Sequence, residues 1–552
     1  MIAGAAALAS GPVLDGALAE VTDLAEMVAQ LLVMRRERRF FHAAQFNLPV
    51  NLVPVVILDM DMHTPFFPAW RPRLAPLRSG LSQAVHPLRR ATLCQIEQTL
   101  GPALPDSFLK KSPRGPHSRC RVFCLGRTFW GWVWQILQAN TSCREVLRQV
   151  QALQALLGLP AIDENTSAYC QARSKLPTAL LEQMLQSSCA SAQTQSAATT
   201  LLQGRPIKVM DGSSVRLPDT EQNRHAYPAS PNQYSRPGFP ILKILTLFCL
   251  RSGALLARAT GNLDTAETRL LTHLAGHLQP GDILTGDRAY GLYVMLHWTC
   301  RLGADLLARL NCRSRRVDFR QCLQELGQGD ALFLWHKPKV NSKLFSPEQW
   351  EQVPQTMVVR VVRRRLQQKG FRTRELTVVT TLLDPQLYPA QELLAVYFRR
   401  WRLEMCLDDL KTTLAMAQLT CRTPELVHKE LLLFLITHNL LRWIMAQAAD
   451  LGPPLERISF KGTLDTFRQW STALPQLRGP AKGCKQRKLW RLLLTIIAAD
   501  GVPERPRRKE PRAVKLKSKY PRLTKDRHRY VDRWSRNKKR RIQRAKKSTP
   551  LN

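Results

Sequence analysis

The hydrophobic pattern changes its period near residue 205, and this change constrains the fold more than any other feature of the chain. Apolar residues before this point recur at helical spacing, whereas "PIKVMDG" (206–212) and "GDILTGDRAYG" (281–291) read as short β-strands. Between them, residues 242–250 and 254–261 flank a Ser-Gly turn and predict a hairpin. Residues 265–278 predict a helix capped by Thr265. The order strand, hairpin, helix, strand predicts a mixed α/β layer.

Both β-like runs end in an acid beside a glycine. Asp211 precedes "GSS" and Asp287 precedes "RAYG". If the two strands are neighbours, both carboxylates face one cleft at the rim of the sheet. The ordinary alternatives are a turn residue for Asp211 and an N-cap for a helix beginning near Tyr290 for Asp287. The spacing predicts loop positions for Asp219 and Asp282.

A third acid lies in the segment "YFRRWRLEMCLDDLKTTL" (397–414). At about 100° per residue, a helix places Tyr397, Arg400, Glu404 and Lys411 within an arc of roughly 60°, next to an apolar stripe. We expect the stripe to be buried and the polar row to stay open to phosphate. Asp408 shares the arc and rivals Glu404 as a ligand. The alternative is an amphipathic surface helix with i,i+4 ion pairs.

Asp211, Asp287 and Glu404 together would supply hard oxygen ligands, which suit Mg²⁺ or Mn²⁺. Two such ions, about 3.5–4 Å apart, can bind both the attacking and the leaving oxygen of a phosphodiester. The pattern therefore predicts two-metal chemistry on nucleic acid.

The charge of the chain points to the same class of partner. Its 552 residues carry a formal net charge of +40, from 82 Lys plus Arg against 42 Asp plus Glu. Such an excess needs a polyanion, with nucleic acid as the usual one and an anionic membrane surface as the rival. We find no run of 18 apolar residues and expect no membrane-spanning helix.

The 13 cysteines form no paired CxxC framework, which favours reduced thiols in a cytoplasmic protein. Zinc at His117, Cys120 and Cys124 is the alternative, and the pattern offers no second ligand pair for it.

The chain divides by composition into five segments. Residues 1–90 stay unassigned, as a disordered segment or one that precedes a true start at Met60 or Met62. Residues 91–200 predict a helical domain, with a bundle and a DNA-end-binding module as the two interpretations. We expect the catalytic domain at 201–450 with a β-rich insertion at about 312–383, and a helical region at 451–504. Residues 505–552 predict a basic, disordered tail able to contact phosphate.

These motifs together resemble a known family. Tyr, two residues, Arg, three residues, Glu, six residues and Lys is the signature of the insertion-sequence-four family of DDE-type bacterial transposases. Tyr397, Arg400, Glu404 and Lys411 match it without a gap, and "VMDGSSVRLPDT" and "TGDRAYG" resemble the family's two aspartate motifs. The resemblance covers about residues 120–530.

The resemblance implies an RNase H-like catalytic core interrupted by the β-rich insertion. It implies that Asp211, Asp287 and Glu404 are catalytic metal ligands. Tyr397, Arg400 and Lys411, with Arg288 beside Asp287, would bind phosphates at the ends of the mobile element. It also implies a nucleoid-associated homodimer that holds two DNA ends.

Further roles and rival functions stay open at this stage. Trp335 would stack on an unpaired base or be a core tryptophan, and the loop "YPASPNQYSRPGFP" (227–240) would be a lid or a plain connection. The rival functions are another RNase H-like nuclease, such as a junction resolvase, and a DNA-binding protein derived from a decayed transposase.

Overall fold

The computed structural model describes residues 93–105, 109, 122–156, 160–198, 200–228, 239–312, 316–340, 344–365, 375–470 and 482–502. The expectations for residues 1–90, for the basic tail, for His117 and Cys120, and for most of the loop at 227–240 therefore lie outside the described residues. The chain divides into the units Met1–Pro76 and Leu77–Asn552, and all described residues lie in the second.

A nine-stranded mixed sheet organises the described chain, in the order β3-β2-β1-β4-β5-β9-β8-β7-β6. Its strands are β1 (Ile207–Arg216), β2 (Ile241–Cys249), β3 (Leu255–Gly261), β4 (Ile283–Gly286), β5 (Asp305–Arg309), β6 (Gln324–Gly327), β7 (Asp330–His336), β8 (Thr356–Arg365) and β9 (Glu375–Thr380). The predicted hairpin is confirmed as the antiparallel pair β2–β3, while β1, β4 and β5 run parallel to one another.

The helices, in chain order, fall before, within and after the sheet. They are α4 (Leu93–Leu100), α5 (Leu125–Leu137), α6 (Cys143–Leu156), α7 (Ser167–Ser174), α8 (Thr178–Gln195), α9 (Glu221–Ala226), α10 (Glu267–Thr272), α11 (Tyr293–Arg301), α12 (Pro347–Glu351), α13 (Ala390–Asp408), α14 (Pro424–Ala449), α15 (Phe460–Trp470) and α16 (Lys482–Ala499). The predicted helical character of residues 91–200 and 451–504 is confirmed where the chain is described.

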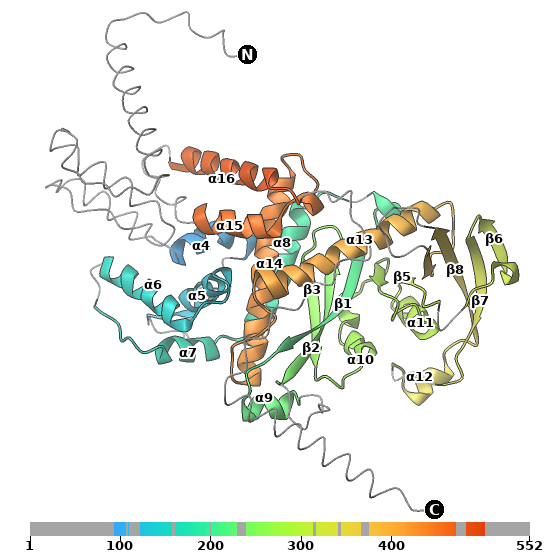
Figure 1. Ribbon diagram of the computed structural model, residues 1–552, viewed down its shortest axis with the longest axis horizontal. Coiled ribbons are helices and arrows are strands. Elements are labelled where there is room, and N and C mark those ends of the chain that lie inside the picture. The colour runs from blue at the N-terminus through green and yellow to red at the C-terminus, as the bar shows by residue number, and fades with distance from the viewer. Residues whose placement is uncertain are drawn as a thin grey trace, which may run out of the picture. The chain divides into compact units, whose positions relative to one another are not determined.

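The two faces of the sheet pack against different helices. Met210, Leu284 and Leu306 of the central strands join one core cluster with residues of α10 and α11. Their strand neighbours Ile207, Ile283 and Leu307 point the other way and join a cluster with α13. Figure 1 shows α13 running across the sheet from β1 towards β8. Along β1, β4 and β5, every second residue counted from Ile207, Ile283 and Leu307 therefore faces α13.

The β-rich insertion extends the same sheet. β9 pairs antiparallel with β5, and β8, β7 and β6 follow in turn, each antiparallel to its neighbour. Trp335 of β7 is 4% exposed and belongs to the core, as the core interpretation predicts.

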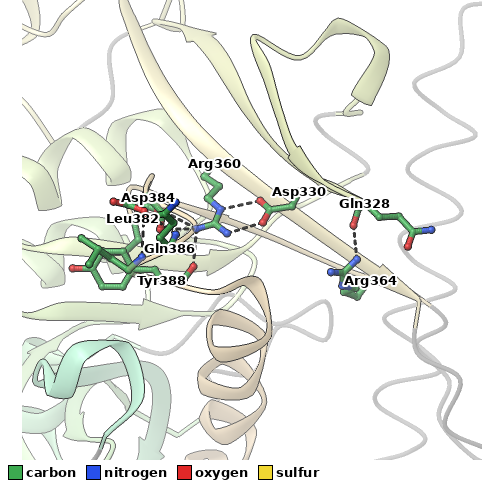
Figure 2. A network of polar contacts seen from close by, with 9 residues as sticks. Gln328, Asp330, Arg360, Arg364, Leu382, Asp384, Gln386 and Tyr388 are labelled. Atoms are coloured by element: carbon green, nitrogen blue, oxygen red, sulfur yellow. Dashed lines mark hydrogen bonds and ion pairs between the residues drawn. The ribbon is translucent and has the colours of Figure 1, made fainter.

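A buried ion pair joins the insertion to the start of α13 (Figure 2). The Arg360 side chain on β8 is fully buried and donates two hydrogen bonds, 2.8 and 2.6 Å, to the carboxylate of Asp330 on β7. Its Nη1 also donates to the backbone carbonyls of Leu382, Asp384 and Tyr388, just before α13 begins. One guanidinium thus fixes β7, β8 and the turn into α13 relative to one another.

Helix α14 forms the centre of the helical part and packs against α5, α8, α15 and α16. It is the one helix in the described part of the chain that is long and apolar enough to cross a membrane, and 89% of its most apolar stretch is buried inside the protein. This burial is that of a core helix.

Two sequence expectations about element ends are wrong. β1 does not stop at Asp211 but continues to Arg216, because β2 pairs with it along its whole length. The helix expected at 265–278 begins at Glu267 without a side-chain cap and ends at Thr272, followed by a 3₁₀ turn at Ala275–His277.

The buried Arg173 side chain lies among three cysteines, Cys143, Cys170 and Cys421. Arg173 of α7 donates to the sulfur of Cys143, at the start of α6, at 2.9 Å, and to the sulfur of Cys421 at 3.0 Å. A hydrogen bond from Cys170 and the charge of Arg173 lower the pKa of Cys143 to about 6.

We expect Cys143 to be alkylated by iodoacetamide at pH 7 before the more exposed Cys484, because Cys143 is already a thiolate. Peptide mass spectrometry after brief labelling measures the order. The Cys170→Ala variant should slow labelling of Cys143 and leave Cys484 unchanged. Faster labelling of Cys484 than of Cys143 in the unmodified chain would contradict the thiolate assignment.

Candidate active site

The register of β1 and β4 brings Asp211 and Asp287 to neighbouring positions. The parallel pairing runs from Ile207 opposite Ile283 to Val209 opposite Thr285. Asp211 lies two residues after Val209, and Asp287 two residues after Thr285. Continuing the register therefore sets the two aspartates side by side, on the face that α13 covers.

Asp211 is not a turn residue and Asp287 is not a helix N-cap, so the two alternative interpretations of these aspartates are wrong. Asp211 pairs with Thr246 inside the β1–β2 ladder, so it is not a turn residue. The helix after Asp287 begins at Tyr293 with Leu292 as its cap residue. The Asp287 carboxylate instead accepts a 2.7 Å hydrogen bond from the backbone N–H of Ala289, which fixes its direction at the end of β4.

Helix α13 carries Glu404 and packs on the strands that precede and hold the two aspartates. It contacts β1, β4 and β5, and Glu404 lies within it. Seven residues before Glu404, Tyr397 lies within reach of the charges of Asp287 and Arg309. Seven residues after it, Lys411 bonds to β1. The helix backbone thus carries position 404 across the strands that hold both aspartates, while the Glu404 side chain lies outside what the structure describes.

A turn of π-helix at Asp409–Thr413 follows α13 and sets the direction of Lys411. Its ammonium donates a 3.2 Å hydrogen bond to the hydroxyl of Ser213, two residues beyond Asp211 on the same face of β1. The predicted arc assumed an unbroken α-helix, and that assumption is wrong for Lys411, because the wider turn changes the angular phase. Lys411 nevertheless reaches the aspartate edge.

The polar row on α13 is not open, and this corrects the sequence expectation. Tyr397 is 0% exposed and Arg400 is 3% exposed, and the Arg400 guanidinium lies 5.2 Å from the centre of the Tyr397 ring. Burial raises the pKa of Tyr397, with Arg400 and Arg309 opposing the shift. Both side chains lie below the surface, and Tyr397 is within reach of the charge of Asp287.

The other charged residues that the sequence singled out near the site differ in their exposure and in their partners. Arg288 and Asp408 are exposed. Asp219 is a loop acid as predicted and pairs with Arg224. Asp282 also lies in a loop as predicted, directly before β4, but its carboxylate is buried and binds the Lys208 ammonium at 2.5 Å.

Sequence reasoning missed a carboxylate on the opposite face of the sheet. Glu267 of α10 lies against Gly212, where an added Cβ would sit 2.8 Å from its Oε1, and it accepts a 3.1 Å hydrogen bond from the Tyr290 hydroxyl. Gly212 therefore leaves room for Glu267 directly behind Asp211. The glycine after Asp211 was the available signal.

The donors at this edge suit a hard divalent cation. Asp211 and Asp287 offer carboxylate oxygens from adjacent strands, and both are partly exposed at the edge. No three His, Cys, Asp or Glu side chains among those described lie close enough to hold an ion. The two aspartates alone therefore form no three-ligand group among the described side chains.

The carboxyl of Asp409, in the π-helical turn, is charged less readily than usual. Burial raises its pKa to about 7. The pKa of Asp409 is higher in the folded than in the unfolded protein. The contribution of its neutral carboxyl to the free energy of unfolding is therefore complete below about pH 4 and is lost as the pH rises through 7. We expect Asp409→Asn to stabilise the protein by about 1–2 kcal/mol at pH 8.5 and by less at pH 5, measured by urea unfolding. Asp408→Asn, at an exposed carboxyl, is the control, and a pH-independent effect of Asp409→Asn would contradict the assignment.

Comparison with known proteins agrees with this geometry. Residues 202–440 match the family model described as the transposase DDE domain. The transposase InsG of insertion sequence element IS4 from Escherichia coli K12 is 25% identical over 323 residues, which covers 58% of this chain and 70% of that protein. A piggyBac transposase synaptic complex with hairpin DNA aligns over 80% of this chain and 87% of its own at 10% identity and a TM-score of 0.36, a level that does not establish a shared fold.

The matched region spans β1 with Asp211, β4 with Asp287 directly after it, α13 with Glu404, and the π-helical turn with Lys411. The comparisons indicate a transposase of the DDE class, an enzyme that cleaves and transfers DNA strands. Among transposases of that class, the chain is similar to the IS4 transposase InsG, and the spacing of Tyr397, Arg400, Glu404 and Lys411 resembles the IS4 signature.

Proposed function

We propose that this transposase cleaves DNA at the ends of an insertion sequence and joins the freed 3′-hydroxyls to target DNA, using Asp211, Asp287 and Glu404 as ligands of two Mg²⁺ or Mn²⁺ ions. The observation that carries the proposal is the shared register of Asp211 and Asp287 beneath α13. When bound, such ions activate the attacking oxygen and stabilise the leaving one. The remaining residues bind and orient the phosphodiester.

The cations around the site suit the binding of DNA phosphates. Lys411 is held over β1 by Ser213, and Arg288 projects beside Asp287. Arg400 and Tyr397 are buried, Tyr397 within reach of the charge of that aspartate, and both would present their polar groups at the floor of the site. Arginine offers a planar fork for phosphate and lysine a point charge.

The order β3-β2-β1-β4-β5, with an antiparallel hairpin followed by parallel strands, supports an RNase H-like core that the β6–β9 insertion extends. The helical region before residue 200 is the proposed binding domain for element ends. We expect a homodimer on DNA because two ends must be held at once, acting in the bacterial cytoplasm at the nucleoid.

The rival function is another RNase H-like nuclease, which would cleave DNA without joining strands. The test uses linear DNA that carries both flanks of the gene, incubated with the purified protein, Mg²⁺ and a supercoiled target plasmid. We expect cleavage next to short inverted repeats and covalent joining of the freed 3′ ends to the plasmid. Cleavage without joining would favour the nuclease, and metal-independent binding without cleavage would favour a DNA-binding protein.

A further inference from the structure

The parallel register that joins the two aspartates continues to a third strand. β4 pairs with β5 from Ile283 opposite Asp305 to Gly286 opposite Ala308. Asp287 follows Gly286, and Arg309 follows Ala308. Asp211, Asp287 and Arg309 therefore occupy neighbouring positions on β1, β4 and β5, in one row across the sheet.

Arg309 points to the same face as both aspartates. Its strand neighbour of the same parity, Leu307, packs in the core cluster that contains Tyr397 of α13. The charges of Arg309 and Asp287 both act on the Tyr397 hydroxyl, one lowering and the other raising its pKa. Arg309 thus stands at the end of the acidic row, beneath α13.

The backbone around Arg309 is held closely. Gly291 packs against it, and an added Cβ at Gly291 would lie 2.5 Å from the Arg309 carbonyl oxygen. The loop that follows Asp287 therefore packs directly against the end of β5. This contact fixes the distance between the Asp287 and Arg309 backbones.

The Arg309 guanidinium keeps its donors available. It is half-buried, and within the described part of the chain no carboxylate forms an ion pair with it and no acceptor takes a hydrogen bond from it. This differs from Arg205 and Arg360 in the same sheet, which pair with Asp305 and Asp330. A partly desolvated arginine at a ligand-binding edge is well suited to an anion.

We propose that Arg309 is a further phosphate-binding residue of this site and that its guanidinium contacts a backbone phosphate of the DNA held over Asp211 and Asp287. This inference rests on the proposed function. It assigns to β5 a phosphate contact that the Tyr-Arg-Glu-Lys signature does not contain.

The test measures DNA binding without metal, so that cleavage does not enter. Full-length protein is titrated with duplex fragments from each flank of the gene, in EDTA, over a range of salt concentrations. We expect Arg309→Ala to weaken binding about tenfold and to lower the slope of log affinity against log salt by about 0.9, the value for one lost phosphate contact. Arg309→Lys should keep the slope and regain part of the affinity.

Arg301→Ala is the matched control, since it removes the same charge from the exposed end of α11, at the opposite edge of the parallel strands. It should change affinity less than twofold. If Arg309→Ala and Arg301→Ala give the same affinity and slope, the proposal is overturned. In that case Arg309 only balances the charge of Asp287.

A second measurement uses only the unmodified protein and therefore tests the proposal even if Arg309→Ala does not fold. Phenylglyoxal labelling of the unmodified protein, read by peptide mass spectrometry, should show Arg309 protected by the flanking duplex and Arg301 labelled equally with and without it. Equal labelling of Arg309 in both conditions would overturn the proposal. Failure of the proposed function would appear separately, as absence of metal-dependent cleavage by the unmodified enzyme.

Discussion

Replacing Asp211 by Asn should lower metal-dependent DNA cleavage by more than about 100-fold while DNA affinity stays within about threefold of the parent. Loss of an outer partner of a metal ligand already costs 10–100-fold, and loss of a ligand should cost more. The amide has the size of the carboxylate, so the β1–β2 ladder at Thr246 is kept. Single-turnover cleavage of flanking DNA in Mg²⁺, with a parallel binding assay, measures both quantities. Asp287→Asn should behave in the same way.

Asp219→Asn is the matched control for this substitution. Asp219 is a nearby acid at the surface, paired with Arg224 and outside the row of strand ends. Its loss should leave cleavage within about twofold. Unchanged cleavage in Asp211→Asn would remove Asp211 from the catalytic site, and a parallel loss of DNA binding would indicate a folding defect instead.

Arg360→Met should lower the free energy of unfolding by about 3–5 kcal/mol, the largest stability effect that we expect from a single substitution. The change leaves the Asp330 carboxylate buried without its partner and removes the donor to three backbone carbonyls at the entry to α13. Because these carbonyls precede the helix that carries Glu404, cleavage should also fall. Chemical unfolding followed by circular dichroism measures the stability.

Two controls separate burial from charge in this experiment. The double variant Arg360→Met with Asp330→Leu should regain most of the stability, since no buried charge remains. The exposed pair Arg320 and Asp318 lies in the same insertion, and Arg320→Ala should cost less than about 1 kcal/mol. A loss below 1 kcal/mol for Arg360→Met would contradict the role given to the pair.

The period of the apolar residues was enough to predict the central part of the sheet. Alternating and continuous apolar runs located β1, β2, β3 and β4, and the Ser-Gly turn located the hairpin. Acids next to glycines at strand ends then marked Asp211 and Asp287. The pairing of β1 with β4, which makes these positions neighbours, comes from tertiary structure and could only be assumed.

What the sequence could not show depends on long-range packing. Helical geometry placed Tyr397 and Arg400 on an open row, but the β4–β5 region and the insertion cover them. The π-helical turn at Asp409–Thr413 leaves no signal in the apolar pattern. Nothing in the sequence distinguished Arg309 from the many other cations. Its position became informative only through the register of β5.

The central claim is that Asp211, Asp287 and Glu404 share bound metal. The most direct test is anomalous diffraction from Mn²⁺-soaked crystals of the protein bound to DNA from an element end. The account predicts two manganese peaks about 3.5–4 Å apart, with oxygens of Asp211, Asp287 and Glu404 as their protein ligands. Manganese bound elsewhere, or Glu404 oxygens more than about 12 Å from both aspartates, would contradict it.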